Sequence, residues 1–97
     1  MNAIVRKNFI MMTIHEQLRF LRKRNRKTQE VLGGLVGVSS RSIRAYETGE
    51  RLPDLGTVSM IMEILCAGSF EVASMLHAWE KAAEAREVCY RPLCKHD

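Results

Sequence analysis

The stretch Thr28–Arg51, "TQEVLGGLVGVSSRSIRAYETGER", contains two short helical patterns separated by a turn of only three or four residues. Thr28 and Ser39 are residue types that cap helix N-termini, and each precedes one of the two patterns. Gly37 and Gly49 follow the patterns and are typical of the left-handed position that ends a helix. Because so short a turn containing glycine cannot return the chain antiparallel, the sequence predicts two helices that cross steeply.

The second helix of this pair has two different faces. We expect an apolar wedge from both helices and the turn to be buried: Leu32, Val36, Val38, Ile43 and Tyr46. The opposite face then presents small and basic residues: Ser40, Arg41, Arg44 and Ala45. A helix about 10–12 Å wide that carries hydroxyl and guanidinium donors fits the major groove of DNA. A solubilising surface is the alternative interpretation of the same residues.

Other capping and stop signals place further helices on either side of this pair. Thr13–Glu16 fits a capping box that begins a helix ending near Asn25. Pro53–Asp54 opens a later helix, and Gly68–Ser69 breaks the chain before a last helical pattern that ends at Pro92. No run of residues alternates as a strand does. The sequence therefore predicts an all-α fold, a compact bundle of about five helices that contains a helix-turn-helix.

We divide the chain into three segments. Residues 1–12 are expected to form an N-terminal arm, residues 13–76 the main helical domain, and residues 77–97 a C-terminal helix extension and tail; the end of the domain at residue 76, and its assignment as a helix-turn-helix DNA-binding domain, are what the family resemblance given below implies. The helix that follows Pro53–Asp54 is expected to point five residues inward: Leu55, Val58, Ile61, Met62 and Leu65. Met60, Met75 and Cys66 are also expected to pack in the core.

The composition favours one small folded domain. The chain has 97 residues, of which 46% are hydrophobic and 27% are charged, as is typical of folded proteins. No apolar run approaches the roughly 20 residues of a membrane span, and the N-terminus lacks the apolar region of a secretory signal. Three cysteines without framework spacing suit a reducing compartment. These features predict a cytoplasmic protein that does not contact a membrane.

Positive charge is concentrated in the first half of the chain. Up to Arg51 there are 11 basic and 4 acidic residues, whereas from Leu52 onward there are 4 basic and 7 acidic residues. A basic half favours a surface that faces a polyanion. The run Arg22–Lys27, "RKRNRK", could supply phosphate contacts or could be a solvated helix end.

Residues 14–76, about two-thirds of the chain, resemble the helix-turn-helix domain of the phage repressor and Cro type, the lambda-repressor-like family. The resemblance is carried by "LRFLRKR", by the stretch Thr28–Arg51 and by "PDLGTVSMIMEILCAGSFEVASML". Its most specific part is one combination of residues at fixed spacings: Gln29, Gly37, Val38, Ser39, Ile43, Tyr46, Glu47, Gly49 and Pro53.

The resemblance implies roles for individual residues. Five residues match positions that face DNA bases or flanking phosphates: Ser39, Ser40, Arg41, Arg44 and Ala45. Four more are expected to hold phosphates: Gln29, Arg22, Thr48 and Arg51. Arg22 is also expected to form an ion pair with Glu47, which would lock the first helix of the domain to the recognition helix.

The chain also departs from the family pattern. Gly33 stands where the family usually has Ala, and Gly34 follows it, so we expect a softer helix at a cost of about 1 kcal/mol for each glycine relative to Ala. Arg26 and Lys27 replace a usual Gly and a usual apolar residue. The loop before Gln29 is therefore expected to be more basic than is usual.

The helical pattern continues beyond Leu76, where the family's domain typically ends. Trp79, Ala82 and Ala83 are candidates for a homodimer interface, since Trp is enriched at interfaces and Ala permits close helix approach. The alternative is that this stretch folds back over the domain's own core.

The C-terminal stretch "CYRPLCKH" raises the question of a metal site or a redox-sensitive thiol. Cys89, Cys94 and His96 lack the tight spacing of a zinc site, and no fourth ligand is evident. We therefore expect no metal and no cofactor.

Together these features predict a sequence-specific regulator of transcription that binds double-stranded DNA. We expect a repressor, encoded by a bacterium or a phage and associated with the nucleoid, that reads an inverted-repeat operator as a homodimer. The recognition helix would span about residues 39–47. One alternative is an antitoxin or restriction-system controller whose residues 77–97 bind a protein partner, and another is a protein-interaction module without DNA binding. No nucleophile–base or carboxylate pair lies on a plausible cleft, so we do not expect an enzyme.

Overall fold

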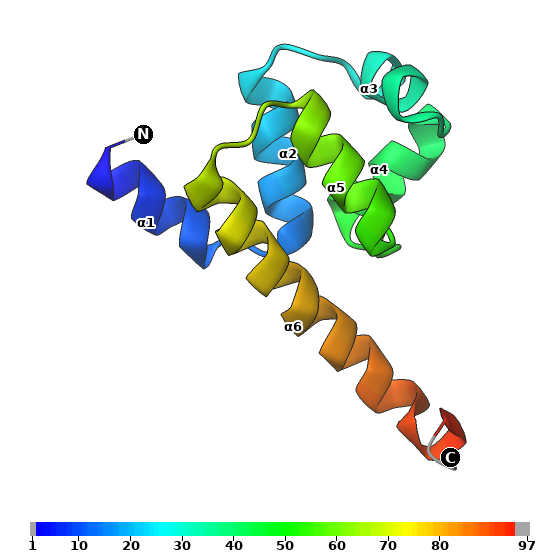
Figure 1. Ribbon diagram of the computed structural model, residues 1–97. Helices are drawn as coiled ribbons and strands as arrows, with labels where there is room; N and C mark the ends of the chain where they lie inside the picture. The colour runs from blue at the N-terminus through cyan, green and yellow to red at the C-terminus, as the bar shows by residue number, and fades with distance from the viewer. Residues whose placement is uncertain (1, 95–97) are drawn as a thin grey trace.

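The computed structural model describes residues 2–94, and the side chains of residues 2–86. It contains six helices: α1 (Ala3–Met11), α2 (Ile14–Arg24), α3 (Gln29–Val36), α4 (Ser40–Thr48), α5 (Leu55–Ile64) and α6 (Ser69–Cys94). Within residues 2–94 no strand is present, which confirms the all-α prediction. Figure 1 shows that α6 begins against the bundle and then extends away from it. No helix in the described part is long and apolar enough to cross a membrane.

The N-terminal segment is a helix rather than the arm that the sequence predicted. The Asn2 side chain caps α1 by accepting a hydrogen bond of 2.9 Å from the amide of Val5. Phe9 is completely buried, and its ring meets Phe20 edge to face at a centroid distance of 5.7 Å. The Gln17 amide donates to the carbonyl oxygen of Phe9 at 2.8 Å. One buried aromatic residue thus attaches α1 to the bundle, which explains the sixth helix.

The structure confirms most of the helix boundaries that the capping signals predicted. Thr13 and Glu16 form a reciprocal capping box, and three further side chains cap the next helices as expected: Thr28, Ser39 and Asp54. Gly37 and Gly49 end α3 and α4 in the left-handed region, with φ of 90° and 84°. The prediction for Pro92 is wrong, because α6 continues to Cys94.

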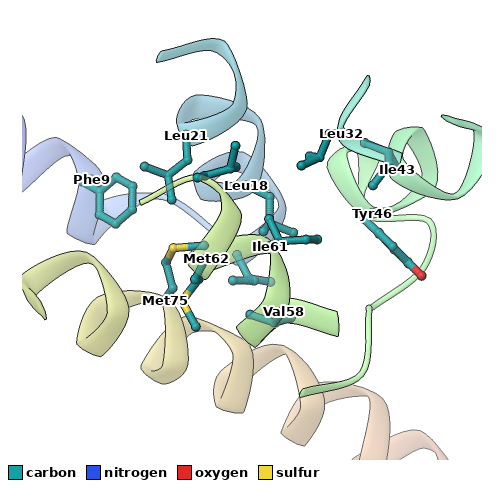
Figure 2. Packing of buried hydrophobic residues seen from close by; sticks show 12 residues of the cluster. Phe9, Leu18, Leu21, Leu32, Ile43, Tyr46, Val58, Ile61, Met62 and Met75 are labelled. Carbon is teal, nitrogen blue, oxygen red and sulfur yellow. The ribbon is translucent and has the colours of Figure 1, made fainter. Parts of the chain in front are cut away.

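The core is formed where the inner faces of all six helices meet, as Figure 2 shows for ten labelled residues. The predicted wedge is present: Leu32, Ile43 and Tyr46 are buried, and Val36 and Val38 are partly buried against them. The other buried residues of this core cluster lie on α1, α2, α5 and α6 and at the C-cap of α5. They are Phe9, Ile14, Leu18, Leu21, Val58, Ile61, Met62, Leu65 and Met75.

Three core predictions are wrong. Leu55 and Met60 are exposed: Met60 lies off the inward face set by Val58, Ile61 and Met62, whereas Leu55 is the first residue of α5, at the edge of the core. Cys66 is exposed as well. It follows the C-cap of α5 with φ of 55°, and this left-handed turn takes its side chain out of the core.

The start of α6 packs back onto the domain, which is the alternative that the sequence left open for this stretch. The Trp79 indole donates to the carbonyl oxygen of Pro53 at 2.8 Å, and Trp79 and Ala82 pack against the core. Arg86 donates to the carbonyl oxygen of Gly49 at 3.0 Å. The side chains of Cys89, Cys94 and His96 lie outside the described residues.

Candidate nucleic-acid interface

The turn between α3 and α4 depends on Gly33. The amides of Gly37 and Val38 both donate to the carbonyl oxygen of Gly33, at 2.8 and 2.9 Å. A Cβ atom on Gly33 would lie 2.6 Å from the carbonyl oxygen of Val38, whereas a Cβ on Gly34 would meet nothing within 4 Å. Gly33 therefore permits the close approach of α3 to the start of α4, whereas a side chain at Gly34 would have open space.

The outer face of α4 carries the predicted recognition residues. Ile43 and Tyr46 face the core, and Arg41 and Arg44 are exposed on the other side. Ser39 is exposed at the N-cap, where its hydroxyl accepts a hydrogen bond of 3.1 Å from the amide of Ser42. The burial of one face of α4 thus leaves two arginines available to a ligand.

Two further residues of the predicted interface lie differently along α4. Ser40 is half-buried at the first position of the helix. Ala45 is only 6% exposed, so its expected place on the recognition face is wrong. The loop that follows α4 returns to this residue, since the amide of Arg51 donates to the carbonyl oxygen of Ala45 at 3.1 Å.

The predicted ion pair between Arg22 and Glu47 is present and buried. Arg22 Nε lies 2.6 Å from Glu47 Oε2, and Arg22 Nη2 lies 3.0 Å from Glu47 Oε1. Arg22 Nη1 donates to the carbonyl oxygen of Lys27 at 2.7 Å. Each guanidinium nitrogen therefore already has a protein partner. The side chain is 11% exposed, so it has little surface left for the phosphate contact that the sequence predicted.

Gln29 lies at the first position of α3 and joins the same network. Its side-chain amide donates to Glu47 Oε1 at 3.1 Å. Glu47 therefore holds both α2 and the start of α3 to the last turn of α4. The first amides of α3 lie beside this network, and an α-helix N-terminus attracts phosphate groups.

The loop after α4 carries an exposed arginine that contacts Ser42 and Tyr46. Arg51 is exposed; its guanidinium carbon lies 5.4 Å from the ring centre of Tyr46, and its Nη1 donates to the hydroxyl of Ser42 at 3.2 Å. Thr48 is exposed, and its hydroxyl donates to the carbonyl oxygen of Ala45 at 3.3 Å. Thr48 ends α4 and Arg51 lies in the loop that follows it, and the phosphate contacts expected of both stay a prediction.

A second ion pair, which the sequence did not predict, joins α2 to α6. Arg24 Nη2 donates to Glu71 Oε1 at 2.9 Å, and the amide of Gly68 donates to the same oxygen at 2.9 Å. The Arg24 guanidinium lowers the pKa of the Glu71 carboxyl below its usual value. The partners are 47 residues apart, so no local spacing could have paired them.

The remaining positive charges near the interface take part in no ion pair with a described side chain. Among residues 2–86, the described ion pairs are those of Arg22 and Arg24. Arg26, Arg41, Arg44 and Lys23 are exposed and take no part in them. In the part of the chain with described side chains, no group of three or more His, Cys, Asp or Glu residues could hold a metal ion. The chemistry of this surface is therefore that of a basic, donor-rich patch.

Comparison with known proteins gives one match. The model of a family described as a helix-turn-helix domain matches residues 16–75. No curated protein and no solved structure matched the chain. The matched residues include all of α3, α4 and α5, and therefore the surface described above.

Proposed function

The chain belongs to the helix-turn-helix domain family, and from this premise we propose that it is a sequence-specific regulator of transcription that binds double-stranded DNA through α4. The observation that carries the proposal is the exposure of Arg41 and Arg44 on a helix whose other side is held by a buried ion pair. We assign it no catalytic role.

Base recognition would come from the outer face and the start of α4. We propose that Arg41 and Arg44 contact base edges, with Ser39 and Ser40 contacting bases or the flanking phosphates. A bidentate contact between arginine and guanine gives about 1–3 kcal/mol of discrimination against the wrong base. Ala45 leaves this set because it is buried.

Phosphate contacts would flank α4 on both sides. Gln29 and the first amides of α3 would hold one phosphate, and Thr48 and Arg51 would hold another. We propose that Arg22 positions these elements through Glu47 rather than touching DNA itself, because its guanidinium is occupied.

A homodimer would present two copies of α4 to an inverted repeat. Two recognition helices about 34–36 Å apart enter successive major grooves on one face of the duplex. Trp79 and Ala82 pack within their own domain, so the contact would use Ala83 and the exposed apolar residues Ile10 and Met11. Repression would follow when the dimer covers a promoter in the cytoplasm of a bacterial cell.

A protein partner is the second candidate for the surface around α6. An apolar hollow lies between the end of α1 and the first half of α6, with Met11, Phe70 and Ala82 in its lining. Met11 is 77% exposed there. An antitoxin or a restriction-system controller would use such a surface to bind its partner, while α4 still bound DNA. If two copies of this chain associated only when another protein was present, that result would favour this candidate.

The first test replaces both exposed arginines. The double variant Arg41→Ala/Arg44→Ala is compared with Lys7→Ala/Lys81→Ala, which removes the same charge from α1 and α6. Binding of a mixed pool of duplexes is measured by gel shift at near-physiological salt. The first variant should lose binding, and the second should keep it. Equal binding by both variants would exclude α4 as the recognition helix.

A further inference from the structure

One side of α6 lines a hollow whose residues are not among the proposed DNA contacts. The hollow has a volume of about 1030 Å³ and lies between α6 and the segment from the end of α1 to the start of α2. Its lining on α6 runs from Phe70 to Arg86, and at 1.5 Å per residue these positions are about 24 Å apart. Figure 1 shows α1 beside the first half of α6. Sites for small molecules are concave and typically hold about 300–1,000 Å³, so this hollow is as large as the larger of them.

The half of the hollow at the start of α6 is apolar. The buried Gln17 amide donates to the carbonyl oxygen of Phe9 at 2.8 Å and to the hydroxyl of Ser74 at 3.0 Å, which places the end of α1 at this half. Phe70 and the exposed Met11 contribute to its lining. The Ser74 oxygen already has a partner in Gln17, so this half offers mainly apolar surface to a ligand.

The other half of the hollow carries the basic groups of its lining. His77, Lys81 and Arg86 follow one another along α6, and His15 at the start of α2 also lines the hollow. Arg86 donates to the carbonyl oxygen of Gly49 at 3.0 Å, and a Cβ atom on Gly49 would lie 3.0 Å from the His15 ring. Side chains from α2 and α6 thus meet at the C-cap of α4.

No residue among those with described side chains that line the hollow is an Asp or a Glu. Glu80 and Glu84 lie on α6 but outside this lining, and Lys81 takes part in neither described ion pair. Arg6 is outside the lining too, and its guanidinium carbon lies 5.0 Å from the ring centre of Phe70. The charges around the hollow therefore favour an anion, and apolar walls strengthen that attraction.

We propose that this hollow binds an amphipathic anion, a medium-chain carboxylate such as decanoate. The hydrocarbon chain lies against Met11 and Phe70, and the carboxylate lies at Lys81 and Arg86, beside the C-cap of α4. Two features support a ligand of this kind: the lining changes from apolar to basic along α6, and the hollow has the volume of a small-molecule site. The inference goes beyond the proposed DNA-binding function and does not depend on it.

Calorimetric titration of the full chain with decanoate tests the inference. Decanoate should bind saturably, at one molecule for each chain. Octanoate has two fewer methylenes and should bind about tenfold more weakly, since each buried methylene changes the affinity about fourfold. Decanol keeps the chain length but lacks the charge, and it should also bind at least about tenfold more weakly, because it forms no charge-assisted hydrogen bond.

Two variants at exposed positions separate the two halves of the hollow. Ala73→Phe fills the apolar half, and Lys81→Glu reverses the charge at the basic half. Each should bind decanoate at least about tenfold more weakly than the wild type, with an unchanged Tm. Lys7→Glu is the matched control, because it makes the same charge change at an exposed residue of α1 outside the lining. It should bind decanoate as the wild type does.

Several results would overturn the inference. Wild-type affinity for decanoate in both Ala73→Phe and Lys81→Glu would show binding elsewhere on the surface. Decanol that bound as tightly as decanoate would show that the basic half takes no part. Failure of decanoate to bind would also overturn it, and if Ala73→Phe then dissociated a dimer in sedimentation, the hollow would belong to a second copy of this chain. None of these measurements uses DNA, so the proposed function is tested separately.

Discussion

Arg22 and Glu47 connect α2 to the last turn of α4 through two hydrogen bonds, Nε–Oε2 at 2.6 Å and Nη2–Oε1 at 3.0 Å, with both side chains nearly excluded from water. Glu47 also accepts a hydrogen bond from Gln29, and Arg22 also donates to Lys27. One carboxylate and one guanidinium thus set the position of the recognition helix relative to α2 and α3.

Removal of one partner of this pair should destabilise the fold strongly. Arg22→Ala leaves the Glu47 charge buried without its partner, which typically costs about 3–5 kcal/mol. Chemical denaturation should show this loss in the free energy of unfolding. The double variant Arg22→Met/Glu47→Leu removes both charges and should lose much less, because no unpaired charge stays buried. Equal losses in the two proteins would contradict a buried, desolvated pair.

The two adjacent glycines of α3 should respond to the same substitution in opposite directions. Gly34→Ala places a Cβ in open space and should stabilise the protein by about 1 kcal/mol, the helix-propensity difference. Gly33→Ala places a Cβ 2.6 Å from a backbone oxygen and should destabilise it by about 1–3 kcal/mol. Thermal unfolding of the two variants checks both signs. An increase in Tm for Gly33→Ala would show that the α3–α4 turn does not need the close approach.

Cys66→Gly should stabilise the protein by about 0.5–1 kcal/mol. The left-handed conformation costs a non-glycine residue about 1–2 kcal/mol, and the greater freedom of glycine in the unfolded chain offsets about 0.4–1 kcal/mol of this. For a domain of this size the gain raises Tm by about 2–8 °C. Cys66→Ala removes the thiol but keeps the Cβ, so it should leave Tm near the wild-type value. If both variants shifted Tm equally, the thiol and not the backbone would be the cause.

The Arg24–Glu71 pair should contribute to the acid limb of the pH–stability curve, the range in which the free energy of unfolding falls as the pH falls. The Glu71 pKa is lowered in the folded protein by Arg24, so the unfolded chain binds more protons in the acid range. The contribution is present above the usual carboxyl pKa of 4.5 and is lost as the pH falls through the lower folded pKa. Glu71→Gln should therefore flatten the decline in stability below about pH 4.5.

Glu63→Gln is the matched control for the pH measurement. Glu63 is exposed on α5 and takes part in neither described ion pair. Urea unfolding at a series of pH values should give this variant the wild-type acid limb. An unaltered acid limb in Glu71→Gln would show that the pair with Arg24 does not contribute to folding stability.

Local signals in the sequence were sufficient to predict most of the helix boundaries. Caps such as Thr13, Ser39 and Asp54, and stops such as Gly37, act within four residues of themselves. The family resemblance added the pairing of Arg22 with Glu47. The exposed positions of Arg41 and Arg44 followed from helical periodicity once the apolar face of α4 was assigned.

Part of what the sequence did not predict concerns contacts between elements distant in the sequence. Phe9 attaches α1 to the core, and Trp79 reaches back to Pro53, yet neither neighbourhood has a periodic pattern that specifies its partner. Ala45 is buried where the loop after α4 returns to the helix, which a single-face pattern does not represent. The left-handed backbone at Arg26 was missed because the sequence has Arg where this geometry favours Gly.

The most direct test of the central claim is selection of bound duplexes from a random pool at near-physiological salt, read by sequencing. The account predicts enrichment of an inverted repeat whose half-sites lie about one helical turn apart, roughly 34–36 Å between centres. It also predicts that the Arg41→Ala/Arg44→Ala variant enriches no sequence. A wild-type protein that enriches no sequence, with binding that fades steeply as salt rises, would show phosphate attraction alone and would contradict a sequence-specific regulator.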